Sequence, residues 1–145
     1  VWWQCKRGLD HVWQAIVDDR IRDNSDCPFC TNRKVASTNS LAALFPGVAK
    51  EWHSSKNKPD TSDTVIATSH RLTWWRCSKC KHEWQAKVEN RTRRNFGCPA
   101  CAGRVVTKDN SLAARYPQIA REGHPKKNGK ITEFHMISQF GGQLF

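Results

Sequence analysis

Three Cys-x-x-Cys pairs constrain the fold of this chain more than any other feature of its sequence. Six of the seven cysteines form these pairs, which are Cys27 with Cys30, Cys77 with Cys80, and Cys98 with Cys101. Two thiols at this spacing can lie on one tight turn and bind a common ion, which suits tetrahedral Zn²⁺. The second and third pairs stand 17 residues apart, as in a four-Cys structural zinc site. The sequence therefore predicts Zn²⁺ bound by Cys77, Cys80, Cys98 and Cys101.

Disulfide bonds are the alternative use of these cysteines. The odd cysteine count and the lack of a secretory leader argue against them. A redox-active pair is less favoured still, because no parallel-sheet pattern surrounds either pair. We therefore expect an intracellular reducing compartment, the mitochondrial matrix first and the nucleus as the alternative. The sequence has no initiator Met, so we expect a processed or partial chain.

The chain repeats itself at an offset of 71 residues. The motif Asn-Ser-Leu-Ala-Ala at 39–43 recurs at 110–114, and His-x-Trp-Gln-Ala at 11–15 recurs at 82–86. Upstream of His11 the offset becomes 72, because one residue is inserted there. Self-similarity at a fixed period indicates an array of one repeated unit. We expect part of a first unit at 1–36, a complete unit at 37–104 and part of a third at 105–145.

Local signals predict short elements around the zinc. Residues 73–76 and 83–88 are rich in Trp and β-branched residues and predict two strands. Ser40 and Ser111 are expected N-caps of short helices at 41–45 and 112–116, each ended by a Pro. A second short helix is expected at 48–52, a polar linker at 54–71 and a helical turn starting at the Cys98 pair. A small zinc-stabilised α+β fold of tandem treble-clef or zinc-ribbon units follows.

These motifs resemble the treble-clef zinc-ribbon repeat family, whose members carry tandem copies. The shared pattern includes Ser-Leu-Ala, Glu-Trp-His, Trp-Trp-x-Cys, Cys-x-His-x-Trp and Cys-Pro-x-Cys, and the full match spans 39–103. The resemblance implies a zinc fold and suspected nucleic-acid binding, without fixing one activity. It also implies that Cys77, Cys80, Cys98 and Cys101 are the ligands, while His82 and Trp84 belong to the framework.

The first copy departs from this pattern. Gly8 stands where the second cysteine is expected, which leaves Cys5, Cys27 and Cys30 as possible ligands. Either this copy has lost its metal, or His11 becomes the fourth ligand of a Cys₃His site. The non-ligating role expected for the equivalent His82 argues against the second alternative. Spacing alone leaves both open.

A strong excess of positive charge points to nucleic acid as the partner. The formal net charge is +11, and between residues 71 and 108 only Glu83 and Glu89 oppose ten basic side chains. A dense positive surface on a small rigid module is typical of a protein that binds phosphate backbones. A merely solvated face is the alternative. The expected nucleic-acid-binding residues are Arg76, Lys79, Lys81, Lys87, Arg91, Arg93, Arg94 and Arg104.

The tryptophans can either form small cores or stack on bases. Because Trp3, Trp13, Trp75 and Trp84 recur at fixed repeat positions, we expect them in the core around each zinc. The remaining Trp2, Trp52 and Trp74 are expected to be partly exposed. We expect His53 and His124 to make local hydrogen bonds.

Three function classes follow from these features. The first is a non-catalytic zinc protein that binds structured RNA beside neighbouring proteins, as a structural subunit of a ribonucleoprotein such as an organellar ribosome. The second is a DNA-binding module of a larger DNA-processing protein. A nuclease is disfavoured because a four-Cys site is closed and cannot activate water. No apolar run approaches the roughly 18 residues of a membrane span. We therefore favour RNA over DNA and expect neither an enzyme nor a membrane partner.

Overall fold

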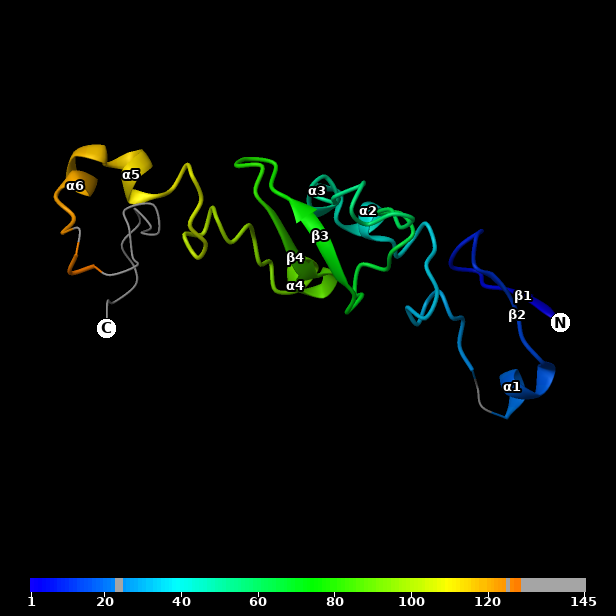
Figure 1. Ribbon diagram of the computed structural model, residues 1–145. Helices are drawn as coiled ribbons and strands as arrows, with labels where there is room; N and C mark the ends of the chain where they lie inside the picture. The colour runs from blue at the N-terminus through cyan, green and yellow to red at the C-terminus, as the bar shows by residue number, and fades with distance from the viewer. Residues whose placement is uncertain (23–24, 125, 129–145) are drawn as a thin grey trace. The chain divides into compact units, whose positions relative to one another are not determined.

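The computed structural model describes residues 1–22, 25–124 and 126–128 (Figure 1). It has the expected small α+β fold of short hairpins and short helices. The chain forms two compact units, Val1–Phe96 and Gly97–Phe145. Within the described residues, no helix has the length and apolar character that crossing a bilayer requires.

The first hairpin carries the degenerate copy of the repeat. Strands β1 (Trp2–Gln4) and β2 (Val12–Gln14) pair antiparallel, with Trp3 opposite Trp13. Helix α1 (Val17–Ile21) follows directly. Such a short hairpin has little stability in isolation, so its cysteine cluster and aromatic contacts must stabilise it.

The second hairpin repeats this arrangement in the complete copy. Strands β3 (Leu72–Arg76) and β4 (Glu83–Lys87) pair antiparallel, with Trp75 opposite Trp84. Helix α4 (Val88–Thr92) follows. The predicted second strand therefore ends one residue early, because Val88 turns into the core as the first residue of α4.

Two pairs of short helices confirm the predicted serine caps. Helices α2 (Leu41–Leu44) and α5 (Leu112–Arg115) each begin after a serine whose Oγ accepts a backbone N–H, from Ala43 at 3.2 Å and from Ala114 at 3.3 Å. Each is followed by a helix that begins at a proline, α3 (Pro46–Ala49) and α6 (Pro117–Arg121). The helix expected at 48–52 therefore starts earlier than predicted, because Pro is well suited to the first helical position.

The core of the complete copy is small and lies between the helix pair and the second hairpin. Leu41, Val65, Trp75 and Val88 form it, and partly buried side chains such as Phe45, Val48, Trp52, Trp84 and Ala86 pack against it. The expected core role of the repeated tryptophans is confirmed at Trp13 and Trp75, which are buried. Because Val65 comes from the segment predicted as a polar linker, that prediction was incomplete. The polar residues on both sides of the short apolar run 65–67 hid its buried residues.

The segment after β4 also differs from expectation. The pair Cys98 and Cys101 lies in turns and not in a short helix. Three backbone hydrogen bonds close these turns, including Arg104 N–H to Pro99 O at 2.8 Å. Gly103 follows with φ of 68°, a left-handed conformation that ends the turn and suits glycine.

Candidate metal centres and basic surface

The first candidate metal centre consists of the four predicted cysteines. Ligand atoms of Cys77, Cys80, Cys98 and Cys101 all lie within 4.8 Å of one another. The turn after β3 positions the first pair, since Cys77 N–H donates to His82 O at 2.9 Å and Lys81 N–H to Cys77 O at 3.1 Å. Four thiols so arranged fit a tetrahedral structural zinc site.

Glu51, which lies just after helix α3, makes hydrogen bonds that stabilise this turn. Its Oε1 accepts hydrogen bonds from the backbone N–H of Ser78 at 3.0 Å and from the Ser78 hydroxyl at 2.9 Å. The neighbouring His82 stacks on Trp84, with ring centroids 6.3 Å apart. His82 therefore contacts the aromatic framework, as the resemblance implied.

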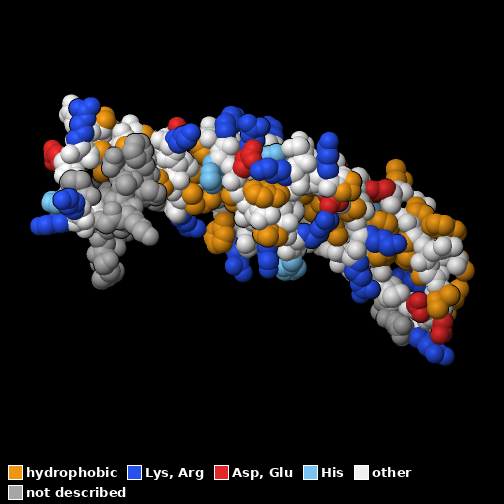
Figure 2. All heavy atoms as spheres, viewed as in Figure 1, with side chains coloured by type: hydrophobic (Ala, Val, Ile, Leu, Met, Phe, Trp, Pro, Cys, Tyr) orange, Lys and Arg blue, Asp and Glu red, His pale blue; other side chains and the backbone are white. Residues whose placement is uncertain are grey.

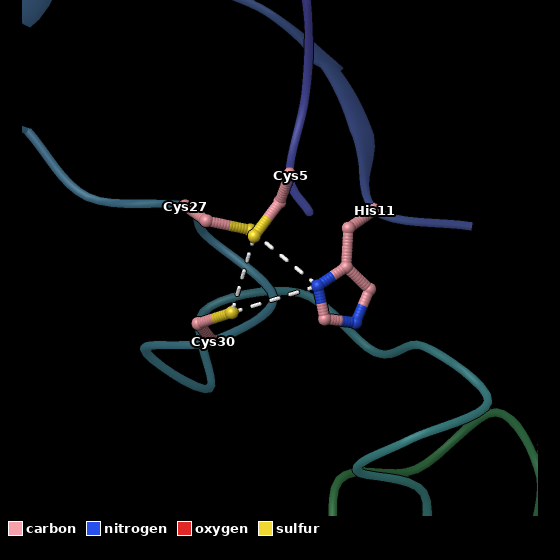
Figure 3. Close-up of side chains that lie close together, drawn as sticks. All are labelled: Cys5, His11, Cys27 and Cys30. Carbon is pink, nitrogen blue, oxygen red and sulfur yellow. Dashed lines mark hydrogen bonds between the residues drawn. The ribbon is translucent and has the colours of Figure 1, made fainter. Parts of the chain in front are cut away.

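The second candidate metal centre lies in the degenerate copy. Ligand atoms of Cys5, His11, Cys27 and Cys30 all lie within 4.8 Å of one another. His11 Nδ1 points at the thiols, 3.7 Å from Cys27 Sγ and 3.5 Å from Cys30 Sγ (Figure 3). Of the two alternatives left open by the sequence, this arrangement supports a Cys₃His zinc site over loss of the metal.

Contacts around His11 hold the imidazole in this orientation. Its Nε2 lies 2.7 Å from Thr38 Oγ1, and its ring stacks on Phe29 at 5.1 Å. With the proton on Nε2, the ring donates to Thr38 and presents the Nδ1 lone pair to the thiols. Second partners of this kind usually orient a metal-binding histidine.

Gly8 makes room for the imidazole. A Cβ added at Gly8 would lie 2.6 Å from Cδ2 and 2.7 Å from Nε2 of His11. Any side chain there therefore collides with the ring. The loss of the cysteine at position 8 and the inward orientation of His11 are therefore coupled. A one-residue insertion between these two positions accompanies them.

The thiols of this centre differ in acidity. The hydrogen bond from the Arg7 backbone N–H is the main cause that lowers the pKa of Cys5 to about 7. Burial and the neighbouring thiols Cys5 and Cys27 raise the pKa of Cys30 to about 11. Thiols held this close together favour the binding of a cation, which displaces their protons.

Changing Gly8 should test the Cys₃His centre. We expect Gly8→Ala to displace His11 and to weaken zinc binding at this cluster by at least about tenfold, the scale on which disturbed ligand positioning acts. Combining Gly8→Cys with His11→Ala should restore binding, because a thiol then stands where the repeat carries Cys80. Competition with a chromophoric chelator measures both affinities.

Leu9→Ala is the matched control for this experiment, because Leu9 neighbours Gly8 but its side chain is exposed. It should leave the zinc affinity unchanged. Equal affinities for the Gly8→Ala and wild-type chains would show that His11 does not take part in binding.

The segment 51–57 covers the outer edge of β3. Asn57 exchanges two 2.8 Å hydrogen bonds with the backbone N–H and carbonyl of Trp74, and Lys56 Nζ lies 4.1 Å from the centre of the Trp74 ring. Glu83 contacts Lys56 and His53, and these contacts lower the pKa of its carboxyl to about 2.

The predicted local hydrogen bonds of the two histidines are confirmed. The Nδ1 atom of His53 accepts from Lys56 N–H at 3.3 Å, and that of His124 accepts from Lys127 N–H at 3.1 Å. Both histidines follow a short helix and a glutamate in the repeat. The same turn therefore forms in two copies.

Basic side chains lie at both ends of the second hairpin. Figure 2 shows Lys and Arg side chains gathered at both ends of the β3–β4 hairpin. The exposed members of the predicted set are Arg76, Lys79, Lys81, Lys87, Arg93 and Arg94 in the first compact unit, and Arg104 in the second. Lys81 Nζ donates to Ser78 O at 2.8 Å, and Arg76 Nε lies 3.9 Å from Glu83.

Arg91 does not belong to this surface, and its prediction as a phosphate-binding residue was wrong. Its side chain is buried, its guanidinium pairs with Glu51, and its charge lies 5.1 Å and 5.2 Å from the centres of the Trp75 and Trp84 rings. Arg91 therefore links Glu51, which follows helix α3, to the tryptophans of the second hairpin. The sequence gave no sign of this role, because Arg91 stands within a run of basic residues.

Comparisons with known proteins agree with this geometry. A family model described as "Probable Treble clef zinc finger domain" matches residues 1–33 and 48–104. No curated protein matches the chain. Domains of this class commonly bind nucleic acids or proteins. With the family match covering most of the chain and two Cys/His clusters that can hold zinc, this chain belongs to the treble clef zinc finger family.

Proposed function

We propose that this chain is a non-catalytic zinc protein that binds structured RNA through its basic surface. It serves as a structural subunit of a large ribonucleoprotein, such as an organellar ribosome in the mitochondrial matrix. The observation that carries the proposal is the set of exposed Lys and Arg side chains on the β3–β4 hairpin and just after α4, on a chain of net charge +11. A fixed positive surface of this density binds the phosphate backbone.

The composition of the metal centres supports a structural role. Each cluster offers four protein ligands, the closed arrangement of a structural zinc, whereas catalytic zinc keeps one position for water or substrate. Helix lengths favour RNA over DNA, since the described helices have four or five residues each. Helices this short present few side chains to a DNA major groove. Structured RNA, in contrast, is recognised largely through its shape and backbone.

Salt dependence of binding tests the proposal. Affinity for a structured RNA should fall steeply with salt, and the double variant Arg93→Ala/Arg94→Ala should reduce the slope of log K against log salt by roughly 1 to 2, one contact per side chain. Fluorescence anisotropy with a hairpin RNA, and with duplex DNA of the same sequence, measures both slopes.

Arg22→Ala is the matched control, because Arg22 occupies the place of Arg93 in the first copy but lies 3.1 Å from Asp18. It should change the slope little. Binding that is independent of salt would exclude a phosphate contact surface, and tighter binding of the DNA duplex would favour the DNA-binding alternative. Sequencing of the nucleic acid that purifies with the native protein identifies the particle.

A further inference from the structure

An exposed aromatic side chain, Phe96, ends the basic segment 93–96 that follows helix α4. Phe96 is 45% exposed, and the other residues of the segment are exposed as well. Arg93 and Arg94, two of the predicted phosphate-binding residues, stand just before it in the chain. The segment therefore presents a flat apolar ring beside two cations.

Two hydrogen bonds fix the backbone of Phe96. Its N–H donates to Asn90 O, in helix α4, at 2.9 Å. Its carbonyl accepts from the guanidinium of Arg91, the buried arginine that pairs with Glu51. A ring carried by a fixed backbone loses less conformational entropy when it binds a partner. Phe96 is therefore preorganised for a contact with another molecule.

The first copy of the repeat shows that this turn forms without an aromatic side chain. Ser25 takes the place of Phe96 at the offset of 71 residues. Its N–H donates to Asp19 O at 3.3 Å, and its carbonyl accepts from Arg20, so both hydrogen bonds of the complete copy recur. Because a serine supports the same turn, the phenyl ring is not needed to form it, which favours a role in binding.

The charge of the segment changes together with the ring. Segment 93–96 has two arginines and no carboxylate, whereas its counterpart 22–25 has one arginine and one aspartate. The complete copy thus combines the aromatic ring with the cations, and the first copy lacks this combination. Sites for single-stranded nucleic acid combine cations that follow the backbone with aromatic rings on which bases stack.

We propose that Phe96 stacks on an unpaired base of the RNA, while Arg93 and Arg94 bind the phosphates beside that base. This inference rests on the proposed function, and it narrows the partner to structured RNA with an unpaired nucleotide in a bulge, loop or junction. Unstacked bases of such segments can be splayed out and stacked on aromatic side chains, whereas bases inside a helix cannot. Since every base has a π face, the site recognises the unpaired state and not one sequence.

Two RNAs that differ in one base test this proposal. The first is a hairpin with a single bulged adenosine, and the second is the same hairpin with an abasic nucleotide at the bulge, so both carry the same phosphates. The zinc-loaded wild-type chain should bind the first RNA at least about fivefold more tightly, the lower end of what one stacked base contributes. Fluorescence anisotropy at several salt concentrations measures both affinities and their salt slopes.

Phe96→Ser, which introduces the residue of the first copy, should bind both RNAs equally and keep the wild-type salt slope, because the phosphate contacts remain. Phe96→Trp should retain the preference, since Trp also offers a flat aromatic face. Leu44→Ser is the matched control, because it removes another exposed apolar side chain (52% exposed), from helix α2. It should leave the preference unchanged, and zinc content confirms that each variant is folded.

The outcomes separate this inference from the proposed function. Equal wild-type affinities for the two RNAs, with a steep salt dependence, would overturn the stacking and leave RNA binding through the basic surface intact. Binding without salt dependence would exclude the proposed function and the stacking with it. A preference that persists in Phe96→Ser would assign the unpaired base to another residue. If Phe96→Ser loses its zinc, the wild-type comparison of the two RNAs and the Phe96→Trp variant still decide.

Discussion

Removing zinc should unfold this chain. A loaded preparation is expected to carry two zinc ions, one for each cluster, and their loss to a chelator should abolish the cooperative unfolding transition. Apparent zinc binding of structural sites contributes about 10–16 kcal/mol at neutral pH. The core is too small to replace it, because among the described residues the largest fully buried side chains are Trp75, Leu41 and Val88. Metal analysis and circular dichroism during chelation measure the effect.

Single substitutions separate the two centres. Cys77→Ser should retain one zinc, at the Cys₃His cluster, and Cys5→Ser should retain one at the four-Cys cluster. Leu9→Ser, an exposed change beside the first cluster, should keep both. A chain that stays compact and cooperative after complete removal of zinc would contradict a metal-stabilised fold.

Patterns that depend on near neighbours were predictable from the sequence. The spacing of Cys77, Cys80, Cys98 and Cys101 indicated their cluster, because a Cys-x-x-Cys turn fixes two ligands within four residues. The Ser40 cap was predictable for the same reason, since its bond to Ala43 N–H spans three residues. The strands of the second hairpin followed from their Trp and β-branched residues.

Features that depend on tertiary contacts were not predictable. Burial of Arg91 requires Glu51, 40 residues away in the chain, and two tryptophan rings that form its site. Orientation of His11 toward the thiols requires the space beside Gly8, which spacing alone does not reveal. For Arg91 the surrounding packing gives a role other than the one its residue type suggested, and for His11 it favours ligation among the two alternatives that the sequence left open.

The pair formed by Arg91 and Glu51 should be the main electrostatic determinant of stability in the complete unit. The two side chains are only 7% and 14% exposed. Removing one partner of a buried ion pair leaves the other charge unpaired, and typically costs about 3–5 kcal/mol. Arg91→Ala also removes the contacts with Trp75 and Trp84. We expect both Arg91→Ala and Glu51→Ala to lower the free energy of unfolding by this amount, measured by urea denaturation followed through tryptophan fluorescence.

The neighbouring Arg93 provides the matched comparison, because it lies two residues away and is exposed. Arg93→Ala should change the free energy of unfolding by no more than about 0.5 kcal/mol, as surface substitutions usually do. It should nevertheless weaken RNA binding, whereas the folded fraction of Arg91→Ala should bind RNA with the wild-type salt slope. Equal losses of unfolding free energy in Arg91→Ala and Arg93→Ala would contradict a stabilising role of the buried ion pair. A reduced salt slope of RNA binding in Arg91→Ala would show that Arg91 contacts phosphate. Because the two arginines belong to the same basic run, their opposite effects would separate the residue that holds the unit together from the residue that contacts its partner.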